Sequence, residues 1–310
     1  MSLVIAVALP VFAVIAIGYL AGRTKQMTAV ESGALNAFVF RFAMPAALFG
    51  LTAGAAPPDD RDLAVALSYG AGALAALLVG YFLSQRLFPL TKQEAGAHAL
   101  TSTLGNAVFL GLPIALTMEG WAKPFVSAML IEGTVIIAIL TALVAPRRDD
   151  GGALSRAANF IVGPLKNPLI LGMILGFLYS ATGLPFDGPV ATFFNLLGRA
   201  AGPTALFALG LFMATHRFPP LKSVAGRVGL IAATKMVLLP AVALSVAALL
   251  GVNDPVYWGA LALFVFVPCG VGTFVLASQY GVYKSESAAA VSVTLLLSVV
   301  TVSAVLAVFG

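Results

Sequence analysis

Charged residues are the scarcest class in this sequence. Of its 310 residues, 9% are Asp, Glu, Lys or Arg and 60% are hydrophobic, and the mean hydropathy is +1.03. Average globular chains carry roughly a quarter charged residues, so the composition excludes an ordinary soluble domain. The net charge of +5 does not indicate a nucleic-acid partner, because the basic residues stand singly or in pairs between apolar runs.

Cysteine and histidine are also scarce. The single cysteine, Cys269, excludes an internal disulfide. An intramembrane hydrolase needs a nucleophile with a base, or a metal cluster. Two histidines, His98 and His216, and one cysteine provide neither. We therefore expect no enzyme, no metal site and no cofactor beyond a coupling proton or sodium ion.

Apolar runs of about 20 residues, the length that crosses a hydrocarbon core, recur along the chain. Strict alternation of apolar and polar residues, which is typical of a β-barrel, is absent. The sequence predicts an all-α polytopic membrane protein with ten spans, at 3–22, 31–53, 62–84, 94–118, 123–144, 165–183, 187–213, 223–250, 256–280 and 286–309.

The basic residues orient these spans, because Lys and Arg accumulate in cytoplasmic loops. The opposite set of loops holds only Arg61 and Lys123. The first 22 residues lack a basic n-region and are not a cleavable signal peptide, so both termini are predicted to be periplasmic or extracellular in a bacterial inner membrane. The predicted cytoplasmic loops hold Arg23, Lys25, Arg86, Lys92, Arg147, Arg148, Arg156, Lys166, Arg217, Lys222, Arg227 and Lys284.

The sequence repeats itself at an offset of 158–161 residues. Each copy holds five spans, an odd number, so the second copy must enter the membrane inverted. Inverted repeats are typical of secondary transporters. The predicted organisation is a first repeat at 1–145, a cytoplasmic linker at 146–164 and a second repeat at 165–310. The anchors are Pro10 with Pro168, Arg41 with Arg199, Gly111 with Gly272, and Lys123 with Lys284.

Spans four and nine are partners in the repeat, and both carry helix breakers. Proline removes an N–H donor, and glycine lowers the cost of leaving helical dihedrals. Unpaired backbone is costly in lipid, so we expect the two breaks to cross near the midplane and to aim half-helix N-termini at an anion. Asn106 would add directional hydrogen bonds. The predicted site comprises Gly105, Asn106, Gly111, Pro113, Pro268, Cys269, Gly270 and Gly272. The structural alternative is that these residues serve helix packing alone.

These residues carry a resemblance to the auxin efflux carrier family, which includes plant PIN proteins and malonate carriers. Asn106 is followed seven residues later by Pro113, as in that family. Span nine matches the family pattern "PxGxxxFVxAxxY" from Pro268 to Tyr280. The chain departs from the family at Gly105, where a proline is frequent, and at Cys269, where a polar residue is frequent.

The resemblance implies a sodium/proton-antiporter-like fold and a homodimer. Spans 1, 2, 6 and 7 would form a scaffold, and spans 3–5 and 8–10 would form a mobile transport domain that moves substrate by an elevator motion. The implied function is secondary transport of a small organic anion, such as a carboxylate or an auxin-like acid. The alternatives are a sodium/proton antiporter, a bile-acid-type sodium symporter and a channel.

Ionisable residues inside predicted spans are candidates for function. Glu132 and Lys235 lie at mid-span and could form a buried ion pair, either proton-carrying or static. Arg41 and Arg199 are repeat mates that could attract an anion, although an interface role is favoured. His98 is expected to be a solvated residue at a loop edge. Glu119 and the cluster of Asp59, Asp60 and Asp62 are expected to be solvated span ends.

Overall fold

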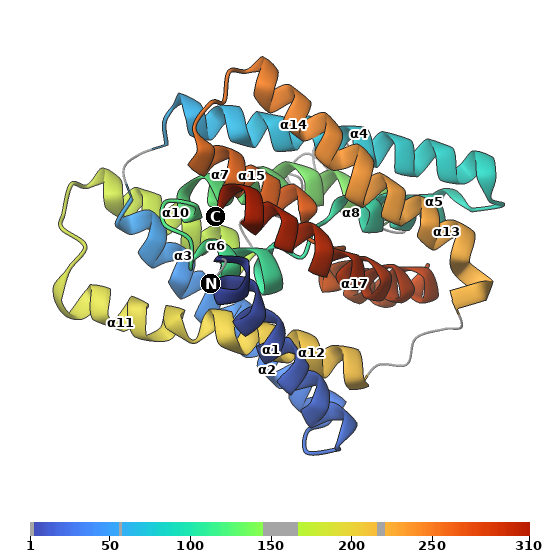
Figure 1. Ribbon diagram of the computed structural model, residues 1–310, viewed down its shortest axis with the longest axis horizontal. Helices are drawn as coiled ribbons and strands as arrows, with labels where there is room; N and C mark the ends of the chain where they lie inside the picture. The colour runs from blue at the N-terminus through green and yellow to red at the C-terminus, as the bar shows by residue number, and fades with distance from the viewer. Residues whose placement is uncertain (1–2, 56–57, 145–166, 216–220) are drawn as a thin grey trace, which may run out of the picture.

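The computed structural model describes residues 3–55, 58–144, 167–215 and 221–310, and within these ranges helices account for nearly the whole chain (Figure 1). Every predicted span contains helix. The linker at 146–164, His216 and five of the predicted cytoplasmic basic residues lie outside the described ranges. The helices of the first half are α1 Leu3–Arg23, α2 Ala29–Phe38, η1 Val39–Ala43, α3 Met44–Ala53, α4 Asp60–Leu87, α5 Lys92–Thr103, η2 Ala107–Gly111, α6 Leu112–Ala115, α7 Ala122–Ile131, η3 Glu132–Ile136 and α8 Ile137–Val144.

The second half also contains both continuous and interrupted helices. The segments written η here and in the first half are single stretches of π-helix inside longer helices. The helices of the second half are α10 Pro168–Ala181, α11 Gly188–Arg199, α12 Ala201–Thr215, α13 Leu221–Ala233, η4 Thr234–Leu238, α14 Leu239–Leu249, α15 Pro255–Phe266, α16 Val271–Tyr280 and α17 Lys284–Phe309.

Five helical stretches in the described ranges are long and apolar enough to cross a membrane. Three further apolar helices, at Leu9–Arg23, Pro168–Ala181 and Pro255–Phe266, are shorter. The composition of the sequence and these helices agree on a polytopic helical membrane protein. The long stretches are Ala29–Ala53, Asp60–Leu87, Gly188–Thr215, Lys222–Leu249 and Lys284–Phe309.

Local sequence signals set the helix starts. Thr28, Asp59 and Thr91 each open a helix with a capping box, in which the side chain of the third helical residue bonds back to the cap's own N–H. Asn167 and Asp254 each cap a helix whose first residue is proline. Proline is favoured there because the first N–H of a helix has no intrahelical partner.

Glycines on α1 and α10 allow the closest helix packing. A Cβ on Gly18 of α1 would lie 2.1 Å from the Phe207 carbonyl oxygen of α12, and one on Gly176 of α10 would lie 2.6 Å from the Phe49 carbonyl oxygen of α3. Small residues let membrane helices approach backbone to backbone. Gly18 and Gly176 are 158 residues apart, the offset of the sequence repeat, so each first helix of a repeat packs on the second helix of the other.

The helices fall into two sets by packing. In one set α1 packs on α12, α12 also packs on α2, and α3 packs on α10 and α11. In the other, α4 packs on α5, α7 and α14, and α17 packs on α13 and α15. Figure 1 shows α4 and α14 along one edge of the molecule and α11, α12 and α2 along the opposite edge, with the interrupted helices between them.

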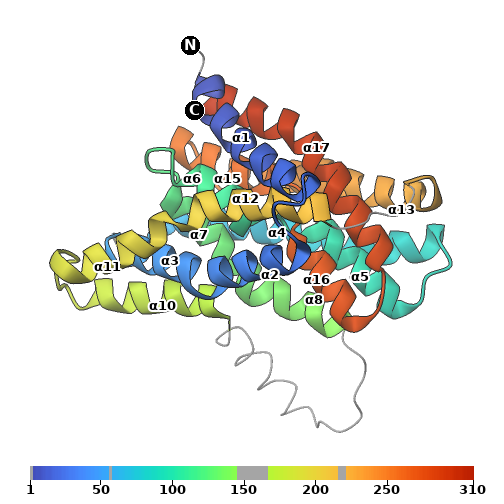
Figure 2. The ribbon, with the colours of Figure 1, turned by 90° about the horizontal axis from the view of Figure 1, so that it is seen from below.

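The two ends of the chain lie on the same side of the molecule. Helices α1 and α17 contact each other. Both views of the ribbon place the beginning of α1 next to the end of α17 (Figures 1 and 2).

Candidate functional site at the helix crossover

The two irregular segments meet backbone to backbone in the interior. The Asn106 N–H donates to the Pro268 carbonyl at 2.8 Å, and the Gly270 N–H donates to the Leu104 carbonyl at 3.0 Å. These bonds make an antiparallel bridge that pairs Gly105 with Cys269. We call Leu104–Asn106 the first crossing segment and Val267–Gly270 the second. Each ends one half-helix and precedes another.

Glycine is needed where the segments touch. A Cβ on Gly270 would lie 2.7 Å from the Gly105 carbonyl oxygen, which is backbone and cannot turn away. A Cβ on Gly105 would lie 2.7 Å from a methyl group of Val267. The close approach of the crossing backbones therefore accounts for both glycines.

Three predicted breakers lie inside helices and not in the breaks. Gly111 ends η2, and Pro113 is the second residue of α6, which continues η2 without a break. Gly111 is required for packing, because a Cβ there would lie 2.6 Å from the Phe125 ring. Gly272 lies in α16, is exposed and would meet nothing within 4 Å. Gly111, Pro113 and Gly272 therefore lie in the half-helices that follow the crossing segments.

One side chain from the last helix of each sequence repeat accepts the central N–H of each crossing segment. Glu132, the first residue of η3, accepts from the Gly105 N–H at 3.4 Å. Thr294 of α17 accepts from the Cys269 N–H at 3.0 Å. Thr294 lies 162 residues after Glu132, close to the repeat offset. The same backbone requirement is thus met by a carboxylate in one half and by a hydroxyl in the other.

Tyr69 and Lys235 complete the support from the sides. The Tyr69 hydroxyl donates to Glu132, and both side chains are buried. Lys235 is fully buried, donates to the Val265 carbonyl at 2.9 Å and lies beside Gly105. Within the described ranges neither Glu132 nor Lys235 forms an ion pair. The expected direct pair was wrong, because each charged group is bonded to a different part of the crossover or its flank.

Asn106 has unused hydrogen-bonding capacity at the crossover. Its backbone is fully engaged, because its carbonyl accepts from the N–H groups of Leu110 and Gly111. Its side chain is 3% exposed, and the amide nitrogen Nδ2 has no hydrogen-bond partner in the part of the chain that the structure describes. A buried unpaired amide is costly. A ligand oxygen or a water at this point would remove that cost.

Each π-helical segment of the described chain carries or adjoins a polar residue singled out from the sequence. Segment η1 contains Arg41, η2 follows Asn106, η3 begins with Glu132 and η4 contains Lys235. Such single-turn insertions occur frequently at functional sites. The π-helical segments and the polar residues inside the predicted spans therefore occur at the same positions in the chain.

Arg41 and Arg199 lie away from the crossover contacts. Both side chains are exposed. The hydrogen bonds and ion pairs of the described ranges include neither of them. Whether this pair attracts an anion or serves an interface stays a prediction. Cys269, also predicted at the site, is fully buried in the bridge.

His98 was expected to be a solvated residue at a loop edge, and this prediction was wrong. This residue of α5 is fully buried, and its Nδ1 lies 2.8 Å from the Tyr283 hydroxyl. Tyr283 has a left-handed backbone with φ of 56° just before α17. Nearby, Arg227 of α13 pairs with Glu286 of α17 at 2.5 Å. Tertiary packing of α13 and α17 over α5 buries a histidine that the sequence placed at a loop edge.

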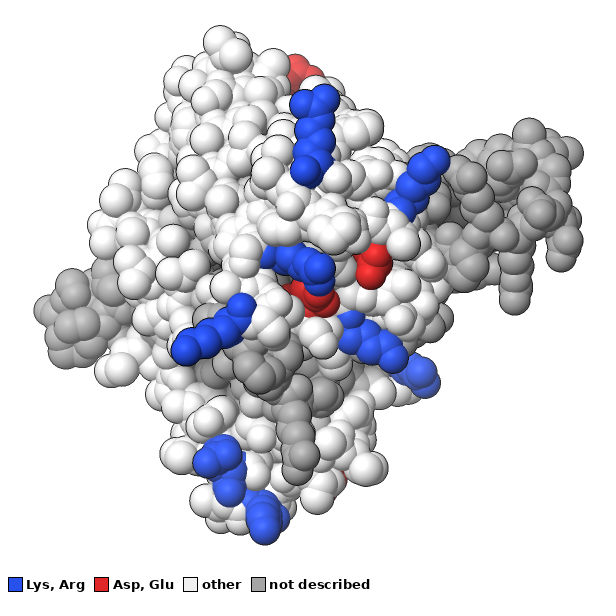
Figure 3. All heavy atoms as spheres, turned by 90° about the vertical axis from the view of Figure 1, so that its right-hand side faces the viewer, with Lys and Arg blue, Asp and Glu red and all other residues white. Residues whose placement is uncertain are grey.

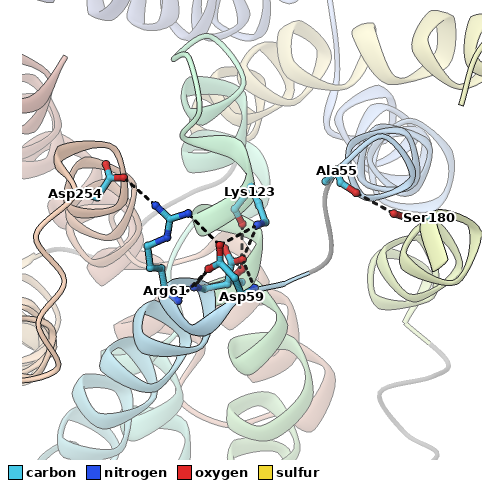
Figure 4. Close-up of polar contacts among 8 residues, drawn as sticks. Ala55, Asp59, Arg61, Lys123, Ser180 and Asp254 are labelled. Carbon is cyan, nitrogen blue, oxygen red and sulfur yellow. Dashed lines mark hydrogen bonds and ion pairs between the residues drawn. The ribbon is translucent and has the colours of Figure 1, made fainter. Parts of the chain in front are cut away.

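An ion-pair cluster joins the beginnings of α4, α7 and α15 (Figure 4). Lys123 pairs with Asp62 at 2.8 Å, and Arg61 pairs with Asp59 at 3.1 Å and with Asp254 at 3.5 Å. Asp62 is 1% exposed, so its predicted place at a solvated span end was wrong. Glu119 and Asp60 are exposed as expected. The Asp62 N–H donates to Asp59 and lowers the pKa of that carboxyl.

The same close-up shows a link in the other packing set. The Ser180 hydroxyl donates to the Ala55 carbonyl at 2.9 Å (Figure 4). It joins the end of α10 to the segment that follows α3.

Tyr69 and Thr294 are the site residues that sequence reasoning missed. Thr294 could have been found by applying the repeat offset to Glu132. Tyr69 is one aromatic residue in a long apolar span, and nothing in the pattern around it signals a bond to Glu132. Among the described residues, no group of three or more His, Cys, Asp or Glu is placed to hold a metal ion.

Comparison with known proteins gives the family. The model of the membrane transport protein family matches residues 3–306. A Rhizobium meliloti protein named "Putative malonate transporter" is 30% identical over an alignment of 312 residues, covering 96% of this chain and 93% of the relative.

Two further relatives are also named as transporters. "Uncharacterized transporter YfdV" of Escherichia coli K12 is 24% identical over 298 residues, covering 94% of this chain and 93% of its own. "Uncharacterized transporter MJ1031" of Methanocaldococcus jannaschii is 26% identical over 212 residues, covering 66% and 67%. The chain belongs to the membrane transport protein family, the auxin efflux carrier family that its motifs resemble, and it is a transporter and not an enzyme.

Proposed function

We propose that this protein is a secondary carrier that binds a small organic anion at the crossover and moves it by alternating access. The observation that carries the proposal is the unpaired Asn106 amide nitrogen beside two paired, interrupted helices. An amide N–H is a directional donor for a carboxylate. Because the chain belongs to a family of membrane transport proteins, we interpret this site as the binding site of a transported substrate.

The electrostatics of the crossover favour an anion. Two half-helices begin directly after the crossing segments, at Ala107 and Val271. Their free N–H groups and dipoles present partial positive charge. The buried Lys235 ammonium lies beside Gly105 and adds a full positive charge. The Glu132 carboxylate nearby is occupied by Tyr69 and the Gly105 N–H.

The packing sets suggest the moving parts. Helix α12 packs against η2 and α6, so the boundary between the two sets runs past Asn106 and Pro113. We assign α1–α3 and α10–α12 to a scaffold through which two copies dimerise, and the other helices to the transport domain of an elevator. In this arrangement the ten helices form two inverted repeats in a bacterial inner membrane, with both termini outside.

Malonate is the first substrate to test, because it is the anion named for the relative from Rhizobium meliloti. Asn106→Ala in proteoliposomes should raise the malonate concentration for half-maximal uptake about tenfold or more, since a buried hydrogen bond to a charged group contributes roughly 1.5–3 kcal/mol. The fold should survive, because the Asn106 amide nitrogen has no hydrogen-bond partner in the described chain. Asn195→Ala, on the exposed surface of α11, is the matched control. Unchanged uptake by Asn106→Ala would remove this residue from the site.

A panel of mono- and dicarboxylates and aromatic acids separates a wrong substrate from a wrong mechanism. Saturable uptake with counterflow is expected of a carrier and excludes a channel. Proton–sodium exchange without any anion flux would instead favour the antiporter alternative. Against that alternative, Glu132 is the one acid that contacts the crossover within the described ranges.

Glu132 is the candidate for proton coupling. Glu132→Gln keeps an oxygen that accepts from Gly105 but cannot release a proton. Uptake by this variant should lose its dependence on an imposed pH gradient while malonate binding is retained. Glu119→Gln, an exposed acid, should keep the dependence. A normal pH dependence in Glu132→Gln would make the carboxylate a static support.

A further inference from the structure

A groove lies where α4 ends and α5 begins, at the opposite end of α5 from the first crossing segment. It is lined by Tyr81, Phe82, Gln85, Arg86 and Lys92, and its volume is about 550 Å³. Small-molecule sites span roughly 300–1,000 Å³. We call it the α4–α5 groove.

The groove combines aromatic walls with two positive charges. The Tyr81 and Phe82 rings meet edge to face, with centroids 5.2 Å apart. Arg86 and Lys92 are exposed and form no ion pair with an acid in the described part of the chain. The acid nearest in sequence, Glu94, is engaged by the Thr91 N–H and hydroxyl at 2.8 Å each. The lining of the groove therefore carries two positive charges and no acid.

The outer surface of α4 continues the groove with an apolar track. Leu74, Leu78, Phe82 and Arg86 are spaced four residues apart, so they share one helix face. The first three are 46%, 44% and 60% exposed. An apolar stripe that ends in a cation and an aromatic ring matches the order of an acyl chain, an interface and a charged headgroup.

The surroundings carry the same sign of charge. The ends of α4, α5 and α13 lie on the side of the molecule drawn in Figure 3, where basic side chains outnumber acidic ones. Lys222 and Lys284 are also exposed at the corresponding ends of α13 and α17. Anionic phospholipids of the cytoplasmic leaflet are attracted to such surfaces.

We propose that the α4–α5 groove binds one anionic phospholipid, with its phosphodiester between Arg86 and Lys92 and an acyl chain along Leu78 and Phe82. Arginine suits a phosphate because its planar fork can donate two parallel hydrogen bonds. The tyrosine and phenylalanine rings lie at the level of the glycerol backbone.

The test uses the purified full-length protein in detergent. Dioleoyl phosphatidylglycerol, dioleoyl phosphatidylcholine and glycerol 1-phosphate are titrated separately, and melting temperature and lipid adducts in native mass spectra are recorded. Phosphatidylglycerol should raise the melting temperature saturably and leave one retained lipid. Arg86→Gln with Lys92→Gln should raise its half-saturating concentration roughly tenfold. Lys222→Gln with Lys284→Gln removes the same charge from the same face and should not.

Three results would overturn the proposal. They are equal weakening in both double variants, equal stabilisation by phosphatidylcholine, and equal stabilisation by glycerol 1-phosphate, which would indicate general electrostatics, an uncharged lipid or a free anion. Absence of any phosphatidylglycerol effect would overturn it as well. If the Arg86/Lys92 double variant fails to elute as a single species, the single variants Arg86→Gln and Lys92→Gln give the same comparison.

Discussion

The two crossing segments pair with each other through their backbones and differ in the chemistry around them. Each has a central N–H accepted by a side chain from the last helix of its own repeat, Glu132 in one case and Thr294 in the other. The first ends with Asn106, whose amide nitrogen is unpaired in the described chain, whereas the second ends with Gly270, which has no side chain. In the proposed carrier the two segments are supported alike, and the first alone supplies a side chain for the substrate.

The largest expected loss of stability comes from alanine substitution of the glycines in the crossing segments, at Gly270 more than at Gly105. Gly270→Ala places a Cβ 2.7 Å from a carbonyl oxygen of the other segment, so the bridge must open. Overpacking of this kind costs typically about 1–3 kcal/mol, and we expect a lower melting temperature and loss of transport. Gly105→Ala should be milder because it meets a Val267 methyl group. Gly272→Ala, with open space around it, is the control; equal effects at all three positions would contradict the geometry.

The next effect concerns the acceptor of the second segment. Thr294→Val leaves the Cys269 N–H buried without a partner, which costs about 1–3 kcal/mol. Ser292→Ala on the same helix is the matched control, because that hydroxyl bonds only its own helix, at the Ala288 carbonyl. The melting temperature of Thr294→Val should be lower than that of Ser292→Ala. If both melt alike, Thr294 does not hold the crossing segment.

Lys235→Met tests whether the charge serves binding or stability. Methionine keeps most of the volume but removes the buried charge and the bond to the Val265 carbonyl. Because an unpaired charge is costly to bury, its removal offsets the lost hydrogen bond, and the melting temperature should change little while anion affinity falls. Calorimetric titration with malonate measures the second quantity. Full affinity in this variant would make Lys235 a structural residue only.

The smallest effect is expected at the exposed ion-pair cluster. The pKa of Asp59 is lowered in the folded chain by the Asp62 N–H. A carboxyl with a lowered folded pKa stabilises the fold above its ordinary pKa, and this contribution disappears as pH falls through the lowered value. Asp59→Asn should therefore melt slightly below wild type at neutral pH and approach it in acid. A difference that is constant across pH would exclude the ionised carboxylate as its cause.

The sequence predicted some parts of the site and missed others for identifiable reasons. Composition and periodicity located the helices, and the breakers located the crossing segments, because proline and glycine act on their own backbone. The burial of His98 and Asp62 depends on α13, α17 and α7 packing over them, so no local pattern reveals it. The hydrogen-bond partners of Glu132 and Lys235 also come from other helices, so the sequence did not reveal them.

The sequence by itself determined a polytopic helical transporter with two interrupted helices, since hydrophobic length and helix breakers are local properties. Only the tertiary structure decided that the interruption ends at Asn106, that Tyr69 and Thr294 support the crossing segments, and that the Asn106 amide is left unpaired. Hydrogen bonds between residues 25 to 166 positions apart depend on how helices pack, and packing is a property of all the helices together.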